Sequence, residues 1–279
     1  MKFKTYLRRM LSYIRHGQPV NYTTVVIKGT NPSERLKDRN ILITGGGRGL
    51  GFYIAKKCIE EGANVIITGR SEETLKSSVE KLGDNCKYIT CDVTNIESIS
   101  KCIDKAEKFF DGKVDSLVSN AGISLHEGNF RNVSEEGWDT QLNTNLRGNY
   151  FMVKTFIEHL EKHDDPSGNI VVISSERAQR ADDIPYGLTK VATNSFIQGF
   201  ASKVIDENIR INGLAPGVTA SDMTGFKRDE NLYADWQNGN RIFLPEEVAE
   251  VALFLLSDVS DCISGEIINC DKGRYISTW

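Results

Sequence analysis

The sequence predicts a single α/β domain built on a doubly wound parallel sheet. From Asn40 onward, short apolar runs rich in β-branched residues alternate with longer stretches of helical period, as expected of strands joined by crossover helices. The chain has 279 residues, of which 39% are hydrophobic, so its size and core suit one large domain. No internal repeat or Pro/Ser-rich linker interrupts it after residue 40.

Seven strands and six helices follow from this pattern. Residues 41–44 read Ile-Leu-Ile-Thr, a run that is apolar until its end, as expected when helices cover both faces of a sheet. A glycine-rich turn then leads into a helix with Phe52, Ile54 and Ala55 at its start. Later β-branched runs predict strands at 64–68, 87–91, 114–119, 169–174, 210–214 and 266–270. Runs of helical period predict helices at 50–61, 75–82, 96–110, 135–163, 186–205 and 245–256.

Charge divides the chain into two parts. It has 34 basic and 38 acidic residues, a net charge of -4, which argues against nucleic acid as a partner because that affinity needs clustered Lys and Arg. Residues 1–33 carry six basic and no acidic side chains, which leaves the rest of the chain at -10. We therefore expect a basic N-terminal arm at residues 1–37 and the folded domain at 38–279.

The arm is amphipathic, because Phe3, Leu7 and Ile14 lie on one face of a helix with basic side chains beside it. Three interpretations stay open. The apolar stripe of residues 1–17 packs against the body or a second subunit, lies on an anionic membrane surface, or serves as a targeting segment.

The six cysteines show no CxxC spacing and mostly sit in apolar or amphipathic runs, as free thiols do. Reduced thiols favour a cytoplasmic location. No run approaches the ~20 consecutive apolar residues that span a bilayer.

The first predicted strand runs into a turn suited to phosphate. The sequence after Thr44 is Gly45-Gly46-Gly47-Arg48-Gly49-Leu50-Gly51. At such a turn the free N–H groups of a helix start and the helix dipole point at the same place, and the missing Cβ atoms let a pyrophosphate approach. The spacing fits neither GxGxxG nor the phosphate loop GxxxxGK[ST].

Five motifs in chain order resemble those of the short-chain dehydrogenases/reductases. Thr44-Gly45-x-x-x-Gly49-x-Gly51 matches their TGxxxGxG, Asn120-Ala121-Gly122 their NAG, and Tyr186-x-x-x-Lys190 their YxxxK, while Pro216-Gly217 and Asp271-x-Gly273 match two further landmarks. The resemblance covers residues 40–274 and is to the single-domain branch. It implies a Rossmann-type, doubly wound, seven-stranded parallel sheet flanked by helices. The domain at 38–279 is then expected to bind a dinucleotide and to act as an NAD(P)-dependent oxidoreductase.

Charge favours NADP(H) over NAD(H). Arg70 and Ser71 follow the second strand, where a basic group accommodates the 2′-phosphate and an acid would bind the 2′-hydroxyl. Arg48 adds a second cation, and Ser71 can also cap the next helix. The residues expected to contact the cofactor, several of them only by the resemblance, are Thr44, Gly45, Arg48, Gly49, Leu50, Gly51, Arg70, Ser71, Asp92, Val93, Asn120, Ala121, Gly122, Tyr186, Lys190, Pro216, Gly217, Val218 and Ser221.

Tyr186 and Lys190 are expected to carry the chemistry. Their i, i+4 spacing places them on one helix face, where the ammonium group should lower the pKa of the phenol. The resemblance assigns the substrate-orienting serine to Ser175. Ser174 stays open as the alternative, because the stretch from Ser175 to Tyr186 is shorter than in the family.

The helix at 135–163 holds two further candidate groups. By resemblance, Asn145 supports a water in the proton relay, with Asn143 less favoured and a helix-bending role as the alternative. His159 and His163 have a spacing that can bind zinc, but their charged neighbours favour a solvated face. We therefore expect no metal.

The expected reaction is reduction of a carbonyl, or the reverse oxidation of an alcohol, on a small polar substrate. The loop at 176–183 is polar, and Arg177 or Arg180 could meet an anionic substrate unless these charges face solvent. Two other functions stay open, a 3-oxoacyl-[acyl-carrier-protein] reductase and an NADP-binding scaffold or sensor without turnover. The resemblance also implies a homodimer or homotetramer through the helices that carry Asn145 and Tyr186.

Overall fold

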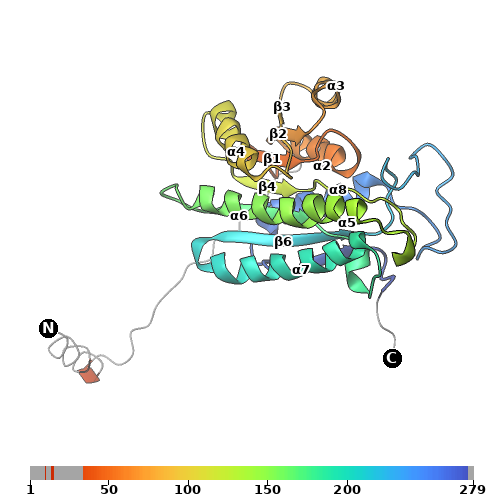
Figure 1. The fold of residues 1–279 in the computed structure, drawn as a ribbon. Coiled ribbons are helices and arrows are strands. Elements are labelled where there is room, and N and C mark those ends of the chain that lie inside the picture. Colours follow the sequence, from red (N-terminus) through yellow and green to blue (C-terminus); the bar gives the residue numbers. More distant parts are fainter. Residues whose placement is uncertain (1–9, 11–13, 16–33, 276–279) are drawn as a thin grey trace.

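A seven-stranded sheet runs through the middle of the molecule (Figure 1). The computed structural model describes residues 10, 14–15 and 34–275. The strands lie in the order β3-β2-β1-β4-β5-β6-β7, and all neighbours are parallel. Their bounds are β1 Asn40–Thr44, β2 Asn64–Gly69, β3 Cys86–Thr90, β4 Ser116–Ser119, β5 Gly168–Ile173, β6 Ile209–Pro216 and β7 Ile267–Cys270. The seven predicted strands and the doubly wound order are confirmed, with bounds that shift by one or two residues.

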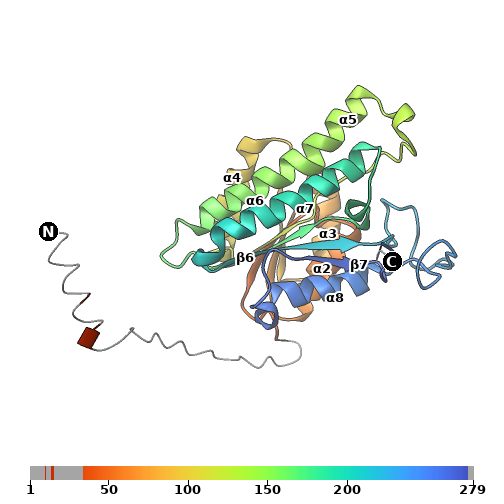
Figure 2. The same cartoon turned by 90° about the horizontal axis from the view of Figure 1, so that it is seen from below.

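Helices cover both faces of this sheet (Figure 2). One face packs against α2 (Gly49–Glu60), α3 (Glu72–Leu82) and α8 (Pro245–Leu256). The other packs against α4 (Ile96–Phe110), α6 (Asn149–Leu160) and α7 (Pro185–Val204). Strand residues alternate between the two layers: Ile41 and Ile43 belong to the first core and Leu42 to the second. This two-sided burial explains why the first strand is apolar along its length.

The predicted helix at 135–163 is divided into three parts. It begins as α5 (Glu135–Gln141), continues through a π-helical stretch at Leu142–Gly148, and ends as α6 at Leu160. The solvated face expected for His159 is wrong, because this side chain is buried against α4. The helix at 75–82 begins three residues earlier than predicted, since the Ser71 hydroxyl accepts a hydrogen bond from the backbone N–H of Thr74 at 3.3 Å and caps it.

The described chain enters the domain along the end of α2. Leu36 is buried in the core, and the Arg35 guanidinium contacts Glu61 Oε1 at 2.7 Å. This hydrogen bond holds the pKa of Glu61 below its usual value. Most of the predicted arm at residues 1–37 lies outside the described residues. Among those that are described, no helix is long and apolar enough to cross a membrane.

Candidate active site

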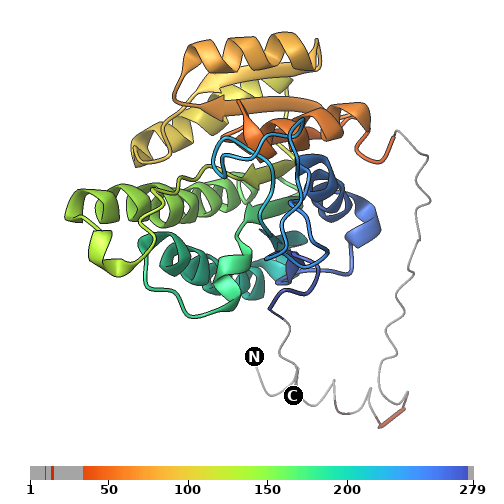
Figure 3. The same ribbon diagram turned by 90° about the vertical axis from the view of Figure 1, so that its right-hand side faces the viewer.

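Figure 3 views the sheet from the end where the segment between β6 and α8 crosses in front of it. β1 and β4 are neighbours, and the strand order runs outward from them in both directions. Such a switch point opens a crevice at the carboxyl ends of the strands, where α/β folds bind ligands. The loops after β1, β2, β4, β5 and β6 all meet at this edge, and they carry most of the predicted site residues.

The turn after β1 forms a cradle without side chains. Gly45 and Gly49 have φ angles of 65° and 54°, which only glycine adopts easily. A Cβ on Gly51 would lie 2.5 Å from the carbonyl oxygen of Gly45, so the turn closes too tightly for any other residue. No side chain caps the start of α2. Its first N–H groups are therefore free for an anion, and the turn fits the pyrophosphate of a dinucleotide.

Thr44 and Asn120 fix this cradle to the sheet. Thr44 Oγ1 accepts hydrogen bonds from the backbone N–H groups of Asn120 at 2.9 Å and Ala121 at 3.1 Å. In return, Asn120 Nδ2 donates to the carbonyl oxygens of Thr44 and Gly45 at 3.0 and 3.1 Å. The glycine turn is thereby held against the end of β4, beside Gly122.

Basic side chains stand near the cradle. Arg70 is exposed at the end of β2, and none of the ion pairs within residues 34–275 involves it. Arg48 lies 3.8 Å from Asp222 in a loose exposed pair. A cleft of about 460 Å³ runs between the glycine turn, α3 and the segment after β6, and its basic lining residues are Arg48, Lys81, Lys227 and Arg228.

The two serines after β5 face different ways. The Ser175 hydroxyl lies close enough to the phenol of Tyr186 to lower its pKa, and it accepts a hydrogen bond from the backbone N–H of Arg177 at 3.2 Å. Ser174 turns toward α7, where its hydroxyl donates to Asn194 Oδ1 at 2.5 Å. Of the two candidates, the structure brings only Ser175 to Tyr186.

Lys190 lies below Tyr186 in a buried position. It is 4% exposed, its Nζ donates to the carbonyl oxygen of Ile173 at 2.8 Å, and Nζ lies 5.8 Å from the centre of the Tyr186 ring. Burial lowers the pKa of Lys190 to about 8.

The pKa of Tyr186 does not follow the expectation from the motif. Burial raises this pKa above its usual value, and the Ser175 hydroxyl and the Arg177 charge only partly oppose the shift. The expected lowering by Lys190 is therefore wrong for the protein without cofactor. The physical reason is that the free-energy cost of removing the phenolate from water exceeds its stabilisation by Ser175 and Arg177.

Asn145 ties the π-helical stretch to the loop after Gly122. Its Oδ1 accepts from the backbone N–H of Ile123 at 2.8 Å, and its Nδ2 donates to the carbonyl oxygen of Ile123 at 2.8 Å. A Cβ on Gly122 would lie 3.3 Å from Asn145 Oδ1 and 3.9 Å from Lys190 Nζ. Asn143 is exposed, so it is Asn145 that reaches the crevice.

The remaining predicted cofactor contacts lie on loops at the same edge. Asp92 Oδ1 accepts from the backbone N–H of Thr94 at 2.9 Å and shapes the turn after β3, next to the buried Val93. After Pro216 ends β6, the carbonyl oxygen of Val218 accepts from the N–H of Phe243 at 3.0 Å.

Gly217 and Ser221 belong to the same loop after β6. The backbone N–H of Gly217 donates to the carbonyl oxygen of Cys270 at 3.0 Å, which joins the loop to the end of β7. Ser221 packs near Gly49, since a Cβ there would lie 3.7 Å from the Ser221 Cβ.

An ion pair that the sequence did not reveal shapes the loop at 176–183. Arg177 donates from Nε and Nη2 to the two carboxylate oxygens of Asp182, at 2.5 and 2.6 Å. The Asp182 side chain is 1% exposed, and a Cβ on Gly187 would lie 1.9 Å from it. Arg177 is therefore engaged by its own loop, and the idea that it meets a substrate anion is not supported. The only sign of this ion pair in the sequence is that Arg177 and Asp182 carry opposite charges and lie five positions apart.

Glu176 is the second residue that sequence reasoning missed. It is 5% exposed between Ser175 and Gly217, and its Oε1 accepts from Arg274 Nη1 at 3.2 Å. Within the described chain its Oε2 has no hydrogen-bond partner. Burial raises the pKa of Glu176. The wall beside Ser175 is thus polar and holds a buried carboxyl group.

Comparisons with known proteins agree with this geometry. The family model described as "Enoyl-(Acyl carrier protein) reductase" matches residues 45–274. The chain is 34% identical over 248 residues to the 3-oxoacyl-[acyl-carrier-protein] reductase FabG of Chlamydia pneumoniae, covering 85% of this chain and 97% of that protein.

Two solved structures share the fold. A 3-ketoacyl-(acyl-carrier-protein) reductase from Brucella melitensis complexed with NADH superposes with a TM-score of 0.80 at 28% identity, over 86% of this chain and 100% of the other. A gluconate 5-dehydrogenase from Burkholderia cenocepacia in complex with NADP and tartrate gives 0.79 at 27% identity, over 89% and 100%.

Proposed function

Because the chain belongs to the short-chain dehydrogenase/reductase family and is an NAD(P)-dependent oxidoreductase, we propose that it reduces a carbonyl group on a small polar substrate with NADPH, or catalyses the reverse oxidation. One observation carries this proposal. Ser175, Tyr186 and Lys190 converge beside Gly122, at the crevice that the glycine turn opens.

In this proposal Tyr186 and Ser175 contact the substrate oxygen, while Lys190 and Asn145 have supporting roles. Tyr186 donates a proton to it, because its raised pKa keeps the phenol protonated at neutral pH. Ser175 holds the same oxygen through its hydroxyl. Lys190 supplies positive charge near the cofactor ribose, and Asn145 positions the loop after Gly122.

The bound nicotinamide would supply or accept the hydride. The residues that we propose hold the cofactor are those predicted above, from Thr44 and the glycine turn through Asp92 and Asn120 to Val218 and Ser221. The uncapped start of α2 would meet the pyrophosphate. Thr44 and Asn120 act by fixing the turn, since the described hydrogen bonds of both run to the backbone around it.

We propose a preference for NADP(H) because Arg70 is exposed, unpaired within the described chain and placed where the 2′-phosphate would lie. Arg48 stands across the glycine turn, and Ser71 can cap α3 and donate to a phosphate at the same time.

This preference predicts the effect of removing one cation. Arg70→Ala should lower the ratio of NADPH to NADH affinity by at least about tenfold, because a charge-assisted pair with phosphate is lost. Titration of each cofactor, followed by nucleotide fluorescence, measures the ratio. Lys203→Ala, an exposed cation on α7, is the matched control. An unchanged ratio in Arg70→Ala would contradict the assignment.

The polar substrate is supported by Glu176 beside Ser175, since an apolar substrate would leave the buried Oε2 of this carboxyl group without a hydrogen-bond partner. Arg180 remains exposed and stacks near Tyr275. A second candidate is reduction of a 3-oxoacyl group on acyl-carrier protein, which the 34% identity to FabG favours.

The deciding experiment is a substrate screen with the purified chain and NADPH. Polyols, sugars and keto acids are compared with an acetoacetyl-carrier protein, and turnover is followed by the absorbance of the reduced nicotinamide. Tyr186→Phe should lose at least about a hundredfold in turnover while it still binds NADPH. Equal turnover by Tyr186→Phe would instead support a cofactor-binding scaffold.

We also propose that the protein works in the cytoplasm as a homodimer or homotetramer. All six cysteines lie in the described region and are free, and four of them are buried, as suits a reducing compartment. Contact with a membrane or partner through residues 1–17 stays a prediction, since nearly all of these residues lie outside the described part of the chain.

A further inference from the structure

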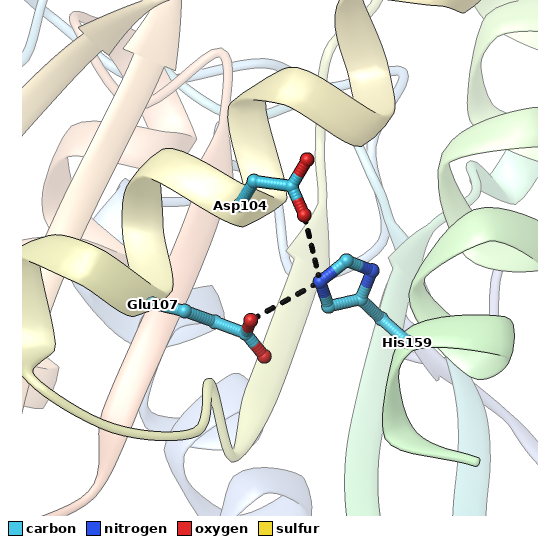
Figure 4. Close-up of side chains that lie close together, drawn as sticks. All are labelled: Asp104, Glu107 and His159. Atoms are coloured by element: carbon cyan, nitrogen blue, oxygen red, sulfur yellow. Dashed lines mark hydrogen bonds and ion pairs between the residues drawn. The ribbon is translucent and has the colours of Figure 1, made fainter. Parts of the chain in front are cut away.

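Three potential metal ligands, Asp104, Glu107 and His159, meet between α4 and α6 (Figure 4). Asp104 and Glu107 lie one turn apart on α4, while His159 lies near the end of α6 and His163 one turn further on. These ends precede β4 and β5, so the cluster is at the amino-terminal edge of the sheet, opposite the cofactor crevice. Neither the catalytic proposal nor the family motifs use any of the four residues.

The spacing of the ligand atoms suits a tetrahedral ion. His159 Nε2 lies 3.3 Å from Asp104 Oδ1 and 3.2 Å from Glu107 Oε2. Neighbouring ligand atoms around a tetrahedral zinc with bonds of about 2.0–2.1 Å are about 3.3–3.5 Å apart. The three ligand atoms all lie within 4.8 Å of one another. His163 Nε2 contacts the other carboxylate oxygen of Glu107 at 2.9 Å and lies beside this group of three.

Electrostatics also calls for a cation here. His159 Nε2 faces carboxylate oxygens of both Asp104 and Glu107, so a proton or a cation has to lie between these three atoms. The His159 side chain is 6% exposed, so water does not readily supply that compensation. Asp104 and Glu107 repel each other across one helical turn. A proton on Nε2 could be shared between the carboxylates, whereas a metal ion would bind all the ligands at once.

We propose that Asp104, Glu107 and His159 bind one divalent transition-metal ion of the zinc class, with His163 beside them. One imidazole and two carboxylates are donors that zinc accepts, and the two carboxylates neutralise its charge. Magnesium and calcium favour oxygen ligands alone and fit less well. The three ligands come from both helices, so the ion would join α4 to α6.

The test is a titration of the full chain with zinc chloride after dialysis against a chelator. Calorimetry should show one zinc site, and zinc should raise the midpoint of thermal unfolding. Asp104→Asn and His159→Gln should each weaken zinc binding by at least about tenfold. His126→Gln, an exposed histidine outside the cluster, is the matched control and should bind zinc as the parent does.

The zinc-binding results can be distinguished from effects of the substitutions on folding and on catalysis. The Asp104 side chain is 52% exposed, so Asp104→Asn should fold even if a His159 variant does not. Cobalt in place of zinc should give the intense visible bands of four-coordinate cobalt, and these should be lost in Asp104→Asn. Absence of zinc binding, binding unchanged in a His159→Gln/His163→Gln double variant, or magnesium binding as tight as zinc would each overturn the site.

Discussion

Ser174 and Ser175 are adjacent, yet their hydroxyl groups serve different partners. The Ser175 hydroxyl lies beside the phenol of Tyr186, whereas the Ser174 hydroxyl donates a hydrogen bond to Asn194. Ser175→Ala should therefore lower kcat/KM by about a hundredfold, because the substrate oxygen loses one of its two donors.

Ser174→Ala is the control for this prediction, since it removes a buried hydrogen bond away from the crevice. It should lower the thermal midpoint slightly and leave kcat/KM near that of the parent. Steady-state kinetics with the best substrate of the screen and a thermal melt measure both. A larger kinetic loss in Ser174→Ala than in Ser175→Ala would reverse the assignment.

The pKa of Lys190 predicts how the rate of the reduction depends on pH. Burial lowers the pKa of Lys190 to about 8, so its ammonium group is present at neutral pH and is lost as the pH rises through that value. The raised pKa of Tyr186 keeps the phenol protonated over the same range. The reductive kcat/KM should thus be constant near neutrality and fall above pH ~8.

This profile is measured with NADPH in a series of buffers, while circular dichroism confirms that the fold persists at each pH. A rate that stays constant well beyond the pKa of Lys190 would show that its charge is not needed for the reduction.

At the level of elements, the Arg35–Glu61 pair fastens the entering chain to α2. The pKa of Glu61 is lowered in the folded state, so the pair stabilises the protein above the unfolded pKa of Glu61, near 4.5, and this contribution is lost as the pH falls through the lower, folded value. Glu61→Gln should lower the free energy of unfolding by about 1 kcal/mol at neutral pH, a modest loss because Arg35 is 30% exposed.

Urea unfolding at neutral and acidic pH tests this change, and the two proteins should converge in stability in acid. Glu60→Gln, next in sequence but with its side chain 50% exposed, is the control and should have almost no effect. If the difference in free energy of unfolding between the parent and Glu61→Gln grew in acid, it would contradict the predicted direction of the pH dependence.

The order and type of elements could be predicted because hydrophobic periodicity reports them directly. The π-helical stretch could not, since one surplus residue within a helix leaves the apolar pattern almost unchanged. The burial of His159 depends on α4, about 50 residues earlier in the chain, and local pattern carries no such information. In the candidate site, the motifs located Tyr186 and Lys190, but the pKa of Tyr186 follows from burial that only packing reveals.

Across the whole molecule, apolar side chains stay exposed along α5, α6 and α7, which lie side by side in Figure 2. They include Tyr150 at 38%, Leu188 at 40% and Val191 at 44% exposure, and Tyr150 stacks with Phe200 at 4.9 Å. Exposed apolar side chains on neighbouring helices suit contact with a second copy of the chain.

Leu188→Glu combined with Val191→Glu should therefore convert the proposed oligomer into smaller species, because burying two unpaired carboxylates in a subunit contact is unfavourable. Size-exclusion chromatography with light scattering measures the mass. Phe109→Glu, at 47% exposure on α4, is the control and should keep the parent mass. A monomeric parent protein would refute the contact itself.

The π-helical segment at Leu142–Gly148 also limits how this chain can vary in length. Each residue advances an α-helix by roughly 100°, so deleting a single residue there would rotate α6 about the helix axis by that angle. The buried side of α6 would then turn out of the core, or Asn145 would leave Ile123. Insertions and deletions are tolerated in surface loops. In this segment the number of residues is fixed, because Asn145 must contact Ile123 while α6 packs into the core.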